Sequence, residues 1–146
     1  MSGPILVVVE DDTLRHSLRD WLALVFAQYT IIEAPGEDAL RLCRAQPPQM
    51  ILIDVDASGR DGVELLHQLK AAVPSADVLA LALHSYAALR EAIEAAGASA
   101  IALKGSLDKE FLKAVAAFLK PDTERSSPKR EPCAKRKLTI VGRLEH

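Results

Sequence analysis

The chain is poor in the features that mark several classes of protein. Its 146 residues include two cysteines, one Trp, two Tyr and three Phe. Cys43 and Cys133 are too few and too far apart for a disulfide framework, and Cys43 is predicted to be a small core residue. Glu10 interrupts the first apolar run before it reaches the length of a signal peptide core, and no apolar run approaches a membrane span. These absences predict a reduced, cytoplasmic protein without a membrane segment, whose core consists mostly of aliphatic side chains.

Net charge is also small, at -2, but its distribution is uneven. Residues 1–119 contain 10 Lys/Arg and 16 Asp/Glu, whereas residues 120–146 contain 8 and 4. We therefore predict an acidic domain over 1–120 and a basic tail or linker over 121–143. Ser and Pro within the tail, and the lack of interleaved aromatic residues, favour a disordered linker over a nucleic-acid-binding arm. Residues 144–146 resemble the start of a vector-derived histidine tag and are left out of the fold prediction.

What the chain does have is a regular alternation of two periodicities. The continuous apolar run at 5–9 predicts a strand buried on both faces, and the stripe of Leu14, Leu18 and Leu22 predicts a helix capped by Thr13. Such alternation implies a mostly parallel sheet with helices on both faces. The predicted strands are 5–9, 29–33, 50–54, 78–83 and 99–103, and the predicted helices are 13–28, 35–45, 63–73, 86–96 and 107–119.

Charged residues follow several of the predicted strands directly. Glu10 and Asp11 follow the first strand, Asp54 ends the third and Lys104 follows the fifth. In a parallel sheet these positions lie at one edge, where functional groups collect. Clustered carboxylates repel one another unless a cation joins them, so we predict a metal-assisted carboxylate site. The alternative for Glu10 and Asp11 is a solvated helix start with favourable dipole placement.

These residues give the chain a resemblance to the receiver domain of bacterial two-component response regulators. The match runs from about residue 4 to 120, with the order and spacing of the family. It implies an α/β, flavodoxin-like three-layer sandwich, with a five-stranded parallel sheet of order 2-1-3-4-5 and five helices. The residues that carry the resemblance are Ile5-Leu6-Val7-Val8-Val9-Glu10-Asp11-Asp12, Ile51-Leu52-Ile53-Asp54, Gly59-Arg60-Asp61-Gly62, Ala95-Ala96-Gly97-Ala98-Ser99 and Lys104.

The resemblance also implies a role for each site residue. Asp54 would accept a phosphoryl group from a histidine kinase or a phosphotransfer protein, because a carboxylate is a competent nucleophile. Glu10, Asp11, Asp54 and the backbone carbonyl of Asp56 would hold Mg²⁺ or Mn²⁺, and Lys104 would contact the phosphoryl group. Such a domain is a signalling module rather than an enzyme, and at most promotes its own phosphorylation and dephosphorylation.

The chain departs from the family at its switch positions. Ala82 stands where the family has Ser or Thr, and Ile101 where it usually has Tyr or Phe. The missing hydroxyl removes a hydrogen bond to a charged acceptor, worth roughly 1.5–3 kcal/mol. Asp56 stands where many members have a neutral residue, which either tightens metal binding or slows attack by an anionic phosphodonor. His84 is a second candidate modulator, flanking the phosphoryl site.

Three functions remain open at this point. The first is a phosphoacceptor domain that relays its signal through the last two helices and the fifth strand, where the resemblance also allows a homodimer. The second is a pseudo-receiver, an interaction module independent of phosphorylation, which Ala82 and Ile101 favour. The third is the N-terminal half of a transcriptional regulator that contacts DNA through the basic tail or a missing output domain.

Overall fold

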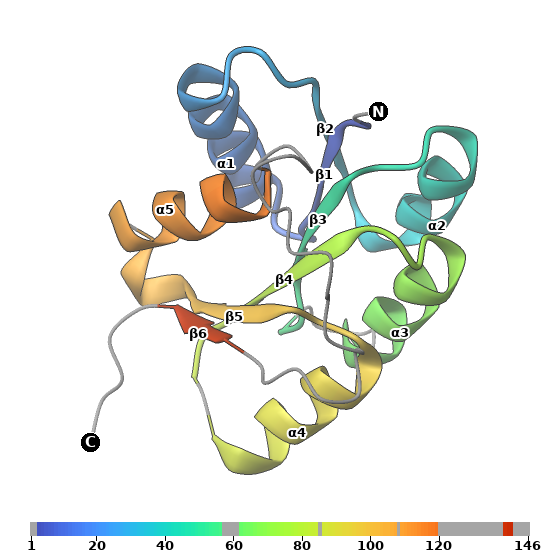
Figure 1. Cartoon of the computed structure of the whole chain (residues 1–146), viewed down its shortest axis with the longest axis vertical. Helices are drawn as coiled ribbons and strands as arrows, with labels where there is room; N and C mark the ends of the chain where they lie inside the picture. The colour runs from blue at the N-terminus through green and yellow to red at the C-terminus, as the bar shows by residue number, and fades with distance from the viewer. Residues whose placement is uncertain (1–2, 57–61, 85, 108, 120–138, 142–146) are drawn as a thin grey trace, which may run out of the picture.

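A parallel sheet lies at the centre of the protein, for which a computed structural model describes residues 3–56, 62–84, 86–107, 109–119 and 139–141 (Figure 1). The strand order is β2-β1-β3-β4-β5-β6. Long apolar runs form the central strands because a parallel sheet is covered on both faces. The strands are β1 (Ile5–Val8), β2 (Ile31–Ala34), β3 (Met50–Asp54), β4 (Asp77–Ala82), β5 (Ala100–Leu103) and β6 (Thr139–Val141).

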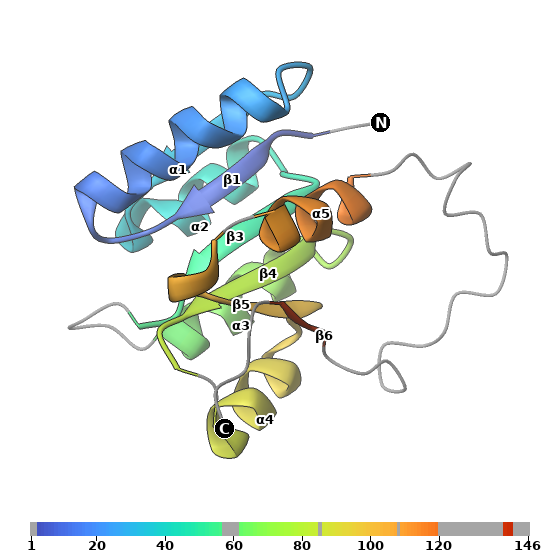
Figure 2. The same cartoon turned by 90° about the vertical axis from the view of Figure 1, so that its left-hand side faces the viewer.

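Helices cover both faces of this sheet, which makes three layers (Figures 1 and 2). One face carries α1 (Asp12–Val25) and α5 (Lys109–Phe118). The other carries α2 (Gly36–Ala45), α3 (Gly62–Ala72) and α4 (Ala87–Ala96), and a short 3-10 turn, η1 (Lys104–Ser106), follows β5. The predicted flavodoxin-like order 2-1-3-4-5 with five helices is confirmed. No helix in the described ranges is long and apolar enough to cross a lipid bilayer.

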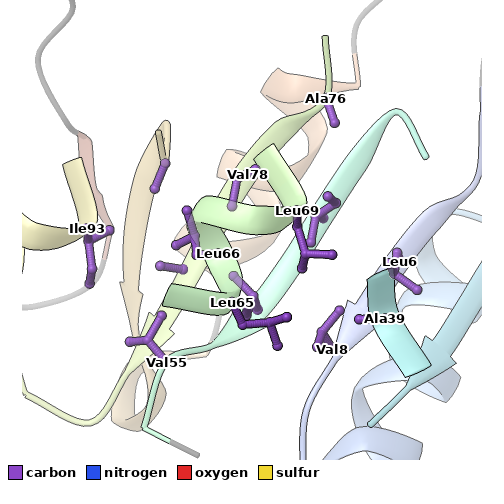
Figure 3. Packing of buried hydrophobic residues seen from close by; sticks show 14 of the residues in the cluster. Leu6, Val8, Ala39, Val55, Leu65, Leu66, Leu69, Ala76, Val78 and Ile93 are labelled. Atoms are coloured by element: carbon purple, nitrogen blue, oxygen red, sulfur yellow. The ribbon is translucent and has the colours of Figure 1, made fainter. Parts of the chain in front are cut away.

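Each face of the sheet has its own hydrophobic core. On the face covered by α1 and α5, Leu22 and Phe111 are fully buried, and the Phe111 ring stacks on Trp21 with 5.6 Å between centroids. On the opposite face, Figure 3 shows the leucines of α3, including Leu66 and Leu69, among the side chains of the sheet. The predicted core residue Cys43 is buried there, and burial raises the pKa of its thiol to about 11. The two cores fix the sheet between its helices.

The start of α1 differs from the sequence prediction. Asp11 is the N-cap, and its carboxylate accepts a hydrogen bond from the Leu14 N–H at 3.2 Å, whereas Thr13 lies inside the helix. The change places the acidic residues closer to the positive end of the helix dipole. At the other end of α1, Val25 is 44% exposed, whereas Phe26, the next residue, is buried.

The sheet also contains a strand that the sequence did not predict. Residues 139–141 fall in the predicted disordered tail, yet they form β6, parallel to β5, with Ala100 opposite Thr139. The basic charge of the tail indicates a linker, whereas the short run Thr139-Ile140-Val141 consists of β-branched residues, which favour a strand. An edge strand offers unpaired backbone groups, and β6 pairs with those of β5. Residues 120–138 lie outside the described part of the chain.

Gly62 allows a close approach between the start of α3 and the end of β3. A Cβ atom on Gly62 would lie 2.5 Å from the Val55 Cα and 2.6 Å from its carbonyl oxygen. A side chain at this position would therefore push against the backbone that follows Asp54. By contrast, a Cβ on Gly105, beside Lys104, would meet nothing within 4 Å.

Candidate functional site

The carboxyl ends of four neighbouring strands position the candidate site. Asp54 is the last residue of β3 and lies opposite Leu81 of β4, while Ala82 of β4 lies opposite Leu103 of β5. Lys104 therefore follows β5 close to the end of β4. Register alone thus brings residues from distant parts of the sequence to one edge of the sheet.

Asp54 and Lys104 form an ion pair at this edge. Lys104 Nζ lies 2.9 Å from Asp54 Oδ2, and Asp54 is only 7% exposed. Burial by itself would lower the pKa of Lys104, but the hydrogen bond to Asp54 and the charges of Asp54 and Asp56 outweigh it and raise the pKa. The lysine is therefore charged at neutral pH, and its charge compensates the burial of the Asp54 carboxylate.

Asp56 is the third member of what we call the lysine cluster: Asp54, Asp56 and Lys104. The Asp56 N–H donates to Asp54 Oδ1 at 2.9 Å, which orients the Asp54 carboxylate. The Asp56 carboxylate lies 3.3 Å from Lys104 Nζ and accepts a hydrogen bond from the Leu83 N–H at 2.5 Å. One lysine therefore serves two carboxylates, and Asp56 connects the ends of β3, β4 and β5.

The acidic turn, defined as Glu10, Asp11 and Asp12, lies after β1 at the same edge. Glu10 Oε2 accepts a hydrogen bond from the Gly36 N–H at 2.7 Å, at the start of α2, while Asp11 caps α1. These carboxylates are therefore bound to backbone groups at helix starts, where negative charge is favourable. In the described part of the chain, no group of three or more His, Cys, Asp or Glu side chains is placed to hold a metal ion.

Arg15 is a site residue that the sequence reasoning missed. It is 9% exposed, and its Nη1 donates to the Val9 carbonyl at 2.9 Å. Its Nη2 lies 2.6 Å from Asp12 Oδ1 and its Nε 3.1 Å from Glu33 Oε1. Arg15 therefore holds the end of β1, the acidic turn and β2 together. The signal was present, because Arg15 shares the helical stripe of Leu18 and Leu22 and is surrounded by acidic residues.

The two switch positions are both fully buried. Ala82 ends β4 and Ile101 lies in β5, and both belong to the core beneath α3 and α4. Ala82 offers no hydroxyl to the site, and Ile101 has no polar group to expose. His84, the other predicted modulator, is exposed two residues after β4.

Comparisons with known proteins show the family and the fold to which this chain is similar. Residues 5–116 match the family described as response regulator receiver domain. Response regulator UvrY of Escherichia coli O6:H1 is 26% identical over 112 residues, which cover 76% of this chain and 51% of UvrY. The chain thus spans about half the length of the curated relatives it matches.

Solved structures show the same fold. The signal receiver domain of a DNA-binding response regulator from Colwellia psychrerythraea has a TM-score of 0.72 at 24% identity, covering 81% of this chain and 98% of that one. A response regulator from Burkholderia pseudomallei, with a phosphorylated aspartic acid and a calcium ion, has a TM-score of 0.68 at 20% identity, covering 86% and 71%. With the family match over residues 5–116, we conclude that this chain belongs to the response regulator receiver domain family of two-component signalling systems.

Proposed function

We propose that Asp54 is the phosphoacceptor of this receiver domain, with a phosphohistidine of a histidine kinase or phosphotransfer protein as donor. The observation that carries the proposal is the ion pair between the buried Asp54 carboxylate and Lys104 at 2.9 Å. A carboxylate oxygen of Asp54 attacks the phosphorus and forms the new O–P bond. The N–P bond of the donor breaks, and the leaving imidazole nitrogen keeps the electron pair. Lys104 offsets the negative charge on the transferred oxygens.

A divalent cation, Mg²⁺ or Mn²⁺, belongs to the same proposal. The donor chemistry fits, since the carboxylates of Glu10, Asp11 and Asp54 and the carbonyl of Asp56 are hard oxygen ligands. Each carboxylate that caps a helix keeps a second oxygen for an ion. When bound, such an ion would supply positive charge that offsets the charge on the phosphoryl oxygens. The phosphorylated aspartic acid and calcium ion in the Burkholderia pseudomallei relative support this assignment.

The proposal also covers how the domain passes its signal on to other proteins or domains. We infer a receiver domain whose last helix ends at Phe118 and whose sheet is extended by β6, which acts in the cytoplasm and relays its state through α4, β5 and α5, where a homodimer can form. UvrY is about twice as long as the matched region, and the Colwellia psychrerythraea relative is a DNA-binding response regulator. These relatives support a DNA-binding output partner. We assign His84 a role in the lifetime of the phosphoryl group because it follows β4 at this edge.

A phosphorylation-independent interaction module is the second candidate. It is favoured by the buried Ala82 and Ile101, which lack the hydroxyl and the aromatic ring that the family usually has at these positions. The two candidates differ in their response to beryllofluoride with Mg²⁺, which mimics an acyl phosphate. Shifts of backbone amide resonances near Asp54 and also along α4, β5 and α5 support the phosphoacceptor. No shift anywhere supports the interaction module.

Acetyl phosphate with Mg²⁺ gives the direct test of the phosphoacceptor. We expect intact-mass spectrometry to show the addition of one phosphoryl group, which Asp54→Asn abolishes. Asp20→Asn is the matched control, because Asp20 is an exposed carboxylate on α1 that pairs with Arg19. Absence of the adduct with acetyl phosphate and with a cognate kinase would contradict the assignment.

A further inference from the structure

The contacts of the Asp56 side chain are not predictable from its position in the sequence. Its carboxylate accepts a hydrogen bond from the Leu83 N–H at 2.5 Å and lies 3.3 Å from Lys104 Nζ. Leu83 lies 27 residues further along the chain. Asp56 is an exposed residue, yet its carboxylate has two partners from later parts of the chain. The contacts therefore fix the segment that follows β4 to the segment that follows β3.

One of the two donors that hold Asp56, Lys104, also pairs with the Asp54 carboxylate that would carry a phosphoryl group. Lys104 Nζ lies 2.9 Å from Asp54 Oδ2, so it is shared between the two carboxylates. A phosphoryl group adds three acceptor oxygens and a charge of about -1.5 to -2. Asp56 would then repel that group and compete with it for Lys104 and the Leu83 N–H. A phosphoryl group on Asp54 would therefore weaken the contact between the Asp56 carboxylate and Lys104.

Ala82 gives this competition a consequence for the loop after β4. Because Ala82 has no hydroxyl, its side chain cannot connect the end of β4 to a phosphoryl group. The adjacent Leu83 N–H is instead already bound by Asp56 in the unphosphorylated chain. Asp56 therefore gives the end of β4 a contact with the lysine cluster that the side chain of Ala82 does not provide.

We propose that Asp56 is a built-in anionic occupant of the phosphoryl-binding donors. It holds the start of the β4–α4 connection through the Leu83 N–H without phosphorylation, and it slows phosphoryl transfer to Asp54. The first part stands on the contacts of Asp56 alone, and the second rests on the proposed function of Asp54. Asp56 is a positioning residue in this scheme, because it acts through Lys104 and Leu83.

Two variants and two readouts test the proposal. Asp56→Asn removes the charge with almost the same shape, and Asp56→Ala removes the acceptor oxygens. The matched control is Asp38→Asn, since Asp38 is a partly exposed carboxylate of α2 that pairs with Arg41 rather than with Lys104. The first readout is the backbone amide resonance of Leu83 without a phosphodonor. The second is the rate at which acetyl phosphate with Mg²⁺ adds a phosphoryl group, followed by intact mass.

We expect the Leu83 resonance to shift in both Asp56 variants and to stay in place in Asp38→Asn. We also expect phosphorylation to become at least about fivefold faster in both, as for the loss of one charge-assisted competitor. A wild-type chain that is phosphorylated, with an unmoved Leu83 resonance or an unchanged or slower rate in the variants, overturns this inference and leaves the proposed function intact. No phosphoryl group on the wild type or on either variant overturns the proposed function and the slowing role of Asp56 together.

Discussion

The acidic turn and the lysine cluster are two groups of carboxylates at the same edge of one sheet, held in different ways. On the acidic turn, Glu10 and Asp11 accept backbone N–H groups at the starts of α2 and α1 and remain exposed. In the lysine cluster, Asp54 is 7% exposed and pairs with Lys104. The first arrangement uses helix starts, whereas the second depends on a side chain from another strand.

The difference indicates which of the two groups of carboxylates can respond to an added negative charge. Arg15 holds the acidic turn in place, because it contacts the Val9 carbonyl, Asp12 and Glu33. The lysine cluster has one cation for two carboxylates, so any new anion at Asp54 must redistribute its contacts. We therefore expect the acidic turn to matter most for stability and the lysine cluster most for phosphoryl chemistry. The following predictions test that division, beginning with the largest effect.

Arg15→Ala should give the largest loss of stability. The change leaves the Val9 carbonyl without this donor and Asp12 without its close cation, and we expect the free energy of unfolding to fall by about 3 kcal/mol. Urea denaturation measures this loss. Arg19→Ala is the matched control, since Arg19 also pairs with Glu33 but is 42% exposed, and it should cost less than about 1 kcal/mol. Equal losses in the two variants would show that Arg15 does not hold the turn.

Gly62→Ala, close to the lysine cluster, should give the second-largest loss of stability. The new Cβ meets the Val55 backbone at 2.5 Å, so the end of β3 or the start of α3 must move, and we expect a loss of about 2 kcal/mol. Thermal or urea unfolding measures it. Gly105→Ala, one residue after Lys104, should change stability by less than about 0.5 kcal/mol. A neutral Gly62→Ala would mean that the close approach does not constrain the segment after Asp54.

Glu10→Ala should have a smaller effect, because it removes one cap from α2. The lost hydrogen bond to the Gly36 N–H should reduce the free energy of unfolding by about 1 kcal/mol. Glu10→Gln keeps an acceptor oxygen and should lose less than half of that amount. Denaturation without divalent ions measures the cap alone. If Glu10→Ala is as stable as the wild type, the carboxylate does not bind Gly36 in solution, and the contrast between the two sides weakens.

The smallest expected effect is a difference in alkaline stability. The folded state raises the pKa of Lys104 above its ordinary 10.5, mainly because contacts with Asp54 and Asp56 outweigh burial, which lowers it. The stabilisation by this lysine is therefore complete below pH 10.5 and is lost as pH rises through the raised pKa. Burial raises the pKa of Cys43 to about 11, so this thiol also contributes a loss of stability as pH rises.

Lys104→Arg in a Cys43→Ala background separates these two contributions. A guanidinium stays charged where a lysine loses its proton, so the variant should lose less stability than Cys43→Ala alone as pH rises above 10.5, the ordinary pKa of lysine. Stability measured by denaturant at several pH values gives the slope. If stability falls equally steeply with pH in the two proteins, Asp54 and Asp56 do not raise the pKa of Lys104.

The sequence predicted the fold and the ends of the strands well for a clear reason. Apolar runs such as Ile5 to Val9 alternate with helical stripes, and that pattern depends only on near neighbours in the chain. It did not predict β6, because the charge of the surrounding tail outweighed a short β-branched run. Nor did it predict the burial of Arg15, since an arginine on a helix is usually exposed.

What the sequence determined by itself is that carboxylates and a lysine stand at the ends of strands in an α/β domain. Only the tertiary structure decided their partners: Glu10 with Gly36, Arg15 with Glu33, and Asp56 with Leu83 and Lys104. These pairs are 18 to 48 residues apart, and the sheet register sets the distances between their atoms. Electrostatic contacts fall off with distance and compete for a few donors, so the identity of each residue does not reveal which contact forms.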